Sequence, residues 1–219
     1  MVSIANVRQQ ALELLEGVPD GEGLDEISRI LTELAVAASV STLDEAGIEL
    51  HAVRALRAGA TPQQVHEVLV LVSGLGVHTL MVGTRTLGRL LRQAGDSRMT
   101  SSLDERQTEL WRARVAGDRF WEAVEREVPG FLDSLLRLDP STFEGFFEYC
   151  GLPWKTHTLS ALTKELIAMA VDATPTHRFM PGVRLHLRNA LQLGAGRIAV
   201  LDALEVAAEG SGHAGIGPS

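Results

Sequence analysis

The chain has 219 residues, of which 45% are apolar, enough for a sizeable buried core in one domain or in two small halves. Its formal net charge is −8 and no tract rich in Lys or Arg is present, so we expect no nucleic-acid partner. The one cysteine, Cys150, excludes an intramolecular disulfide and a Cys-x-x-Cys redox pair.

The N-terminal residues carry charge within the first ten positions and have helical spacing, a pattern that does not predict a signal peptide. The longest apolar run, residues 68–77, is shorter than the roughly 18 to 20 residues that a membrane span needs. We therefore expect a cytoplasmic protein with no membrane partner.

Helical periodicity continues along almost the whole chain. It predicts helices over 24–40, over 61–76, where Thr61 is the N-cap and Pro62 the first helical residue, and over 77–95. The polar stretch 95–102 is the best linker candidate. Further helices are predicted over 103–117, 118–130, 131–138, 140–154, 159–173, 181–194 and 197–210. No strand pattern is present, so the predicted fold class is all-α.

One phrase centred on a histidine occurs twice, as ELHAVRALRAGA around His51 and as RLHLRNALQLGA around His186. Sliding the chain by the interval between these two histidines aligns 24–80 with 159–215 without a gap, with identities mostly at core positions. The pattern predicts a duplicated helical unit. We divide the chain into a first, degenerate repeat (1–95), connecting helices (96–130) and a second repeat (131–219). His78 and His213 also align, and their role and that of His51 stay open.

The second repeat resembles the carboxymuconolactone decarboxylase family, which has the alkylhydroperoxidase D-like fold. The resemblance lies in LSALTKELIAMAV, followed by HLRNALQLGA and a third amphipathic helix, and it is weaker in the first repeat. It implies a double-repeat member that assembles into trimers or hexamers. The apolar segment with Phe143, Phe146 and Phe147 is a candidate interface, or equally an intramolecular core.

The family divides by chemistry just ahead of the repeated histidine. Thiol-dependent members carry cysteines seven and four residues before it, where this chain has Phe179 and Gly182, so thiol peroxidase activity is not expected. The family's proton-relay glutamate corresponds to Glu165, whereas the matching position of the first repeat is Ile30. The resemblance therefore places the site in the second repeat, with Glu165 and His186 as catalytic residues.

A decarboxylase also needs a cation that holds the carboxylate of its substrate. Arg178, Arg184 and Arg188 are candidates because guanidinium groups grip carboxylates through two hydrogen bonds, and His177 in the loop 174–182 is a further substrate-binding candidate. Arg184 and Arg188 share a helix face from which His186 is absent, so we expect at most one arginine beside it. A set of Glu165, His177 and His186 matches no tight metal motif, and we expect neither a metal nor a cofactor.

Two functions follow from these residues, and the sequence leaves open which one applies. The first is a cofactor-free lyase, decarboxylase or isomerase that acts on a small lactone or organic acid by His/Glu proton transfer. The second is a non-catalytic or accessory family member that keeps the fold for assembly or ligand binding. The retention of Glu165 and His186 favours the enzyme, whereas the missing cysteines and the degenerate first repeat favour the accessory role.

Overall fold

The structure is a computed structural model and describes residues 3–216. Every regular element in that range is helical, which confirms the predicted all-α fold class. The described residues divide into two compact units, one formed by residues 3–76 and 153–216 and the other by residues 77–152. These boundaries differ from the predicted divisions at 95/96 and 130/131.

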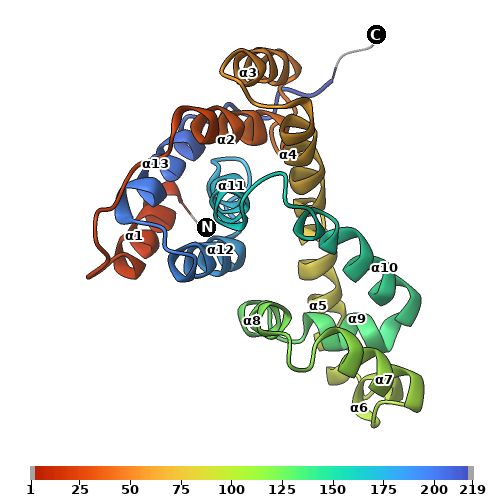
Figure 1. The fold of residues 1–219 in the computed structure, drawn as a ribbon. Coiled ribbons are helices and arrows are strands. Elements are labelled where there is room, and N and C mark those ends of the chain that lie inside the picture. The colour runs from red at the N-terminus through yellow and green to blue at the C-terminus, as the bar shows by residue number, and fades with distance from the viewer. Residues whose placement is uncertain (1–2, 217–219) are drawn as a thin grey trace. The chain divides into compact units, whose positions relative to one another are not determined.

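The first unit contains both copies of the repeated phrase. Its elements are α1 (Ile4–Leu14), α2 (Glu26–Ala38), α3 (Glu45–Arg57), α4 (Pro62–Leu75), a short 3-10 helix (Pro153–Lys155), α11 (Ala161–Ala173), α12 (Met180–Gln192) and α13 (Arg197–Ala208). Helix α11 lies at the centre and contacts α2, α4, α12 and α13 (Figure 1). Ten consecutive residues of α11, from Lys164 to Ala173, are therefore buried.

The two copies also have equivalent helix boundaries, separated by the same interval. Moving α2 and α3 along the chain by the interval from His51 to His186 reproduces both ends of α11 and of α12. Leu43 and Arg178 both have positive φ, at 46° and 51°, in the loops that precede α3 and α12. The left-handed backbone at Arg178 is therefore a property of the loop type, because it occurs equally at an apolar residue. The duplication itself stays a prediction.

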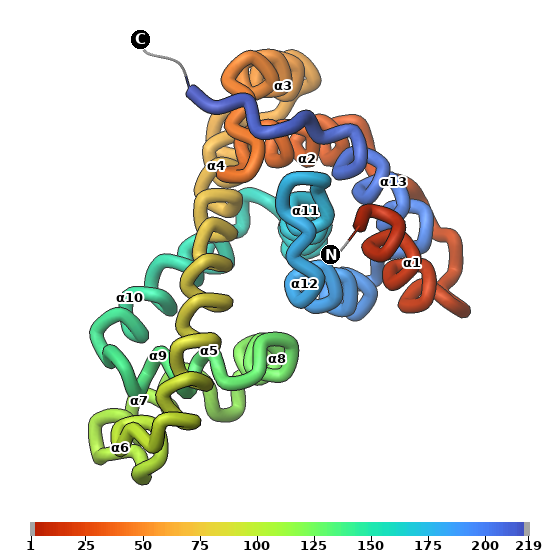
Figure 2. The backbone as a smooth tube through the Cα atoms, turned by 180° about the vertical axis from the view of Figure 1, so that it is seen from behind, coloured from red at the N-terminus to blue at the C-terminus, as the bar shows by residue number. Residues whose placement is uncertain are grey.

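Local sequence chemistry explains several helix ends. Thr61 caps α4 and accepts a hydrogen bond from the backbone N–H of Gln64, whose side chain reaches back to Thr61, and Pro62 is the first helical residue, as predicted. The segment after α13 passes over α2 (Figure 2), and the Ala214 N–H donates to the Thr42 carbonyl at 2.8 Å.

A buried ion pair fixes α4 to the segment that leads into α11. Lys164 Nζ lies 2.8 Å from Glu67 Oε1, and it also donates to the carbonyls of Pro153 (2.7 Å) and Thr156 (3.0 Å). Glu67 Oε2 accepts the Leu159 N–H at 2.9 Å. Both charged side chains are almost fully buried, so each supplies the partner that the other needs inside the unit.

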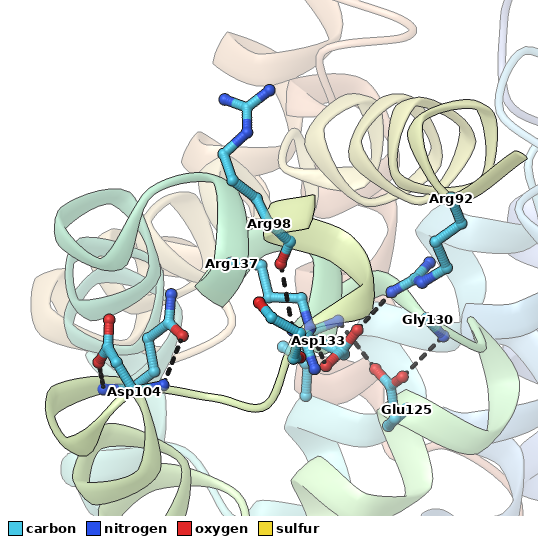
Figure 3. A network of polar contacts seen from close by, with 10 residues as sticks. Arg92, Arg98, Asp104, Glu125, Gly130, Asp133 and Arg137 are labelled. Atoms are coloured by element: carbon cyan, nitrogen blue, oxygen red, sulfur yellow. Dashed lines mark hydrogen bonds and ion pairs between the residues drawn. The ribbon is translucent and has the colours of Figure 1, made fainter. Parts of the chain in front are cut away.

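The second unit contains α5 (His78–Gln93), α6 (Ser97–Thr100), α7 (Glu105–Arg114), α8 (Arg119–Glu127), α9 (Phe131–Leu138) and α10 (Pro140–Gly151). Asp133 on α9 pairs with Arg92 and Arg137, and Arg137 also donates to the Ser101 carbonyl at 2.8 Å (Figure 3). The stretch 95–102, predicted as a linker, instead forms α6 and buries Met99, because these contacts fix it within the unit.

Glu125 gives this unit a second polar anchor. Its carboxylate accepts the N–H groups of Gly130 (2.6 Å) and Leu132 (2.8 Å) at the start of α9 (Figure 3). Burial raises the pKa of Glu125, although the two backbone hydrogen bonds oppose the rise.

The aromatic residues of α10 form the core of the second unit. Phe143, Phe146 and Phe147 are at most 5% exposed, and Phe146 and Phe147 meet Trp121 edge-to-face. Of the two readings of these phenylalanines, the structure favours an intramolecular core over an interface. Burial raises the pKa of the nearby Cys150 thiol to about 12, so this cysteine is protonated near neutral pH.

The stretch Pro62–Gln93, which contains α4 and α5, is long and apolar enough to cross a membrane by length and composition alone. A core helix of a water-soluble protein passes the same test. The observation therefore carries no conclusion about a membrane.

Candidate active site

Glu165 and His186 meet inside the first unit. Glu165 lies on the second turn of α11 and His186 in the middle of α12, and these two helices pack along each other. His186 Nδ1 is 2.6 Å from Glu165 Oε2, and both residues are nearly inaccessible to solvent. A hydrogen bond this short between a carboxylate and an imidazole fixes the ring and places a proton on Nδ1.

Asn189, one turn after His186, completes the surroundings of Glu165. Its Nδ2 donates to Glu165 Oε1 at 3.1 Å, so one carboxylate oxygen is held by the amide and the other by the imidazole. We did not single out this residue from the sequence. Its position three residues after His186, on the same helix face, is the signal that could have identified it.

Asp172 was also missed, although it is fully buried beside His186. Its Oδ2 lies 3.9 Å from His186 Nε2, so the imidazole has a carboxylate facing each ring nitrogen. A Cβ atom at Gly182 would overlap Asp172 Oδ2, and the glycine therefore lets the carboxylate lie against α12. The Phe179 N–H donates to the Asp172 carbonyl at 2.9 Å, which ties the start of α12 back to the end of α11.

The two carboxylates determine the protonation of His186. Burial alone would lower its pKa, but the charge of Glu165, its hydrogen bond and the charge of Asp172 together raise the pKa above the ordinary value of 6.5. Near neutral pH the imidazole therefore carries a proton on both nitrogens more often than a free histidine does. Such a buried imidazolium is suited to donate a proton.

The four substrate-binding candidates, His177, Arg178, Arg184 and Arg188, lie in different surroundings. His177 Nε2 lies 3.5 Å from Asp172 Oδ1, which links this loop residue to the buried pair. Arg184 donates to Gln10 of α1 at 3.2 Å, and Arg188 is exposed on α12. Arg178 follows His177 in the loop and is half-buried.

Within this unit, the groups that are able to ligate a metal near His186 are the carboxylates of Glu165 and Asp172 and the ring of His177. Asp172 Oδ1 and His177 Nε2 have a separation that two ligands of one ion also show. The hydrogen bond with Glu165 occupies Nδ1 of His186, so this nitrogen is not open to a metal.

The first copy of the phrase has a different carboxylate. His51 Nδ1 lies 3.1 Å from Glu33 Oε2, and Arg54 pairs with the same carboxylate. Glu33 therefore gives the first copy a carboxylate, although the position that matches Glu165 is Ile30. Glu33 lies one turn after Ile30, the position that matches Glu165, so the alignment of the two copies does not reveal it. Both His51 and Glu33 are more exposed than their counterparts.

Comparison with solved structures supports the all-helical fold described above. The chain is similar to the crystal structure of a protein from Burkholderia xenovorans LB400 that is provisionally described as a gamma-carboxymuconolactone decarboxylase subunit. The two share 33% sequence identity with a TM-score of 0.70, over 93% of this chain and 75% of the other. No family model and no curated protein matches the chain.

Proposed function

Because the chain belongs to the carboxymuconolactone decarboxylase family, we propose that it is a cofactor-free lyase that removes CO2 from a small lactone or organic acid. The observation that carries this proposal is the buried His186, held by Glu165 through a 2.6 Å hydrogen bond. A structural histidine does not need two carboxylates in a water-excluded setting. An acid that donates a proton to carbon near neutral pH does need its pKa raised.

The proposed reaction moves one proton for each CO2 released. The bond between the substrate carbon and its carboxylate breaks, its electron pair stays on the substrate, and CO2 leaves. His186 then gives the proton on Nε2 to that carbon, while Glu165 keeps the proton on Nδ1 in place. Asn189 holds Glu165 in its orientation, and the charge of Glu165 favours the protonated ring before the transfer.

Arg178 is the arginine that we assign to the substrate carboxylate. Arg178 lies half-buried next to His177 in the loop that precedes α12, whereas Arg184 reaches Gln10 of α1 and Arg188 is exposed. A guanidinium there would hold a carboxylate by two hydrogen bonds. Arg178→Lys is expected to raise KM at least tenfold and to change kcat less, because the lysine keeps the charge but not the paired geometry.

The test is an ultraviolet assay of decarboxylation on 4-carboxymuconolactone and a panel of related lactone and β-keto acids. His186→Gln and Glu165→Gln are expected to lower kcat by about 10²- to 10⁴-fold, the range typical for loss of a general acid. His157→Gln, a change at an exposed histidine of the same unit, is the matched control. Activity that survives both site substitutions would refute the assignment, and no turnover on any acid would favour the accessory role.

We also propose that the chain assembles with copies of itself. The support is a row of exposed apolar side chains on α3, formed by Leu50, Val53 and Leu56 at three-residue spacing. Light scattering coupled to size exclusion is expected to give a trimer or a hexamer. Leu50→Glu together with Leu56→Glu is expected to shift it toward the monomer, and an unchanged mass would exclude this face as the interface.

A further inference from the structure

The proposed reaction leaves His186 without its transferable proton after every turnover. Decarboxylation consumes one proton, and the neutral imidazole must receive another from water before it acts again. His186 is only 6% exposed, so direct exchange with water is restricted. Glu165 does not provide a route for protons from water, because it is equally buried and its two oxygens are held by His186 and Asn189. This inference rests on the proposed function.

Asp172 and His177 form a chain of groups from Nε2 of His186 toward the surface. Asp172 Oδ2 lies 3.9 Å from His186 Nε2, and Asp172 Oδ1 lies 3.5 Å from His177 Nε2. The Asp172 carboxylate is completely buried, whereas the His177 side chain is 17% exposed. Exposure therefore increases along the chain from the carboxylate to His177.

The backbone fixes these groups in place. The His177 N–H donates to the Thr174 carbonyl at 3.1 Å, and the Phe179 N–H donates to the Asp172 carbonyl at 2.9 Å, which together hold the loop against the end of α11. Gly182 leaves the space that the Asp172 carboxylate fills. Both separations along the path exceed a hydrogen bond by less than about 1 Å, a distance that a small rotation of a carboxyl group or an imidazole can close.

We propose that Asp172 and His177 return to His186 the proton that it loses in each turnover. The His177 imidazolium gives up its Nε2 proton as an O–H bond forms at Asp172 Oδ1, which leaves His177 as a neutral imidazole. A half turn of the carboxyl group exchanges its oxygens, and the proton passes to His186 Nε2, restoring the imidazolium and the carboxylate. His177 then takes a proton from water, so the cycle consumes one solvent proton for each CO2.

The first test uses the protein without substrate, so its outcome does not depend on the proposed reaction. Nuclear magnetic resonance on protein with ¹⁵N-labelled histidine follows exchange of the His186 Nε2 proton with water. His177→Gln and Asp172→Asn are expected to slow this exchange at least tenfold, and His157→Gln is expected to leave it unchanged. If Asp172→Asn does not fold, His177→Gln carries the test, because His177 lies in a partly exposed loop. Equal exchange rates in wild type and His177→Gln would overturn the proposal.

The second test separates chemistry from proton return with 4-carboxymuconolactone as the substrate. In His177→Gln the rate of the first turnover is expected to stay within about twofold of wild type, because this turnover uses the proton that His186 already carries and does not need the path. The steady-state rate is expected to fall at least tenfold and to recover as imidazole is added to the buffer. An equal loss in both phases would overturn the proposal. A wild type without turnover would instead count against the proposed function, and the exchange measurement would still decide on the path.

Discussion

Replacing Lys164 by methionine tests how the first unit is held together. The lysine is 2% exposed, lies 2.8 Å from Glu67 Oε1 and donates to the carbonyls of Pro153 and Thr156. Methionine keeps most of the apolar stem but leaves the Glu67 carboxylate in the interior, with the Leu159 N–H as its remaining donor among the contacts described above. Removing one partner of a buried ion pair costs about 3 to 5 kcal/mol, which is a large share of a typical stability of about 5 to 15 kcal/mol.

Two further variants make the reasoning quantitative. Glu67→Gln still offers an oxygen to the Leu159 N–H, and Lys164 keeps its carbonyl acceptors, so we expect a smaller cost of about 1 to 3 kcal/mol. Combining Lys164→Met with Glu67→Leu removes both charges, and the double variant is expected to be more stable than Lys164→Met alone. Lys155→Met, a change at an exposed lysine close in sequence, is the control.

Urea denaturation followed by circular dichroism gives these free energies of unfolding. Hydrogen exchange at the amides of α11 reports on the first unit by itself, which matters because the chain has two compact units. A cost below about 1 kcal/mol for Lys164→Met would refute the reasoning. A double variant whose loss equals the sum of the losses of Lys164→Met and of Glu67→Leu, each made alone, would also refute the reasoning, because independent sites add and coupled ones do not.

Three other predictions follow from the interior of the molecule. Because the pKa of His186 is raised in the folded protein, protonation of this residue stabilises the fold. This contribution to the free energy of unfolding is complete below the unfolded pKa of about 6.5 and is lost as the pH rises through the folded pKa. Unfolding curves across this range should show the decline in wild type and not in His186→Gln. Gly182→Ala is expected to cost about 1 to 3 kcal/mol, because the added Cβ overlaps the Asp172 carboxylate, and Asp172→Ala in the same chain should recover most of it; an additive loss in thermal melts would contradict this. The half-buried Cys150 thiol, with its pKa of about 12, should react with a disulfide reagent at pH 8 at least a hundredfold more slowly than after unfolding, and equal rates would show that the thiol is accessible.

The elements that could be predicted from the sequence are those that local chemistry determines. Thr61 and Pro62 start a helix by their own hydrogen bonding and fixed backbone angle, and Asp139 with Pro140 does the same for α10. The pairing of Glu165 with His186 was reached through the family resemblance, because a glutamate and a histidine 21 residues apart carry no signal on their own.

The residues that could not be predicted are those that tertiary packing brings together. In the sequence, Asp172 is a single polar residue near the end of an apolar helix. Its carboxylate lies beside His186 only because α12 packs along α11. The partner of His51 was missed for a related reason. Aligning the two copies compares equivalent positions, and the position equivalent to Glu165 is Ile30. Glu33, which contacts His51, lies one helical turn after Ile30 and is therefore not found by the alignment.

The contact between Gly182 and Asp172 also restricts how this protein can change over evolutionary time. A side chain at 182 and a carboxylate at 172 claim the same space, so neither position can vary without regard to the other. A cysteine gained at 182 while Asp172 is present would pass through a strained intermediate, whereas loss of Asp172 would open the space first. The order of the two substitutions is therefore constrained, and a cysteine at 182 is accommodated in this sequence only after the aspartate has changed.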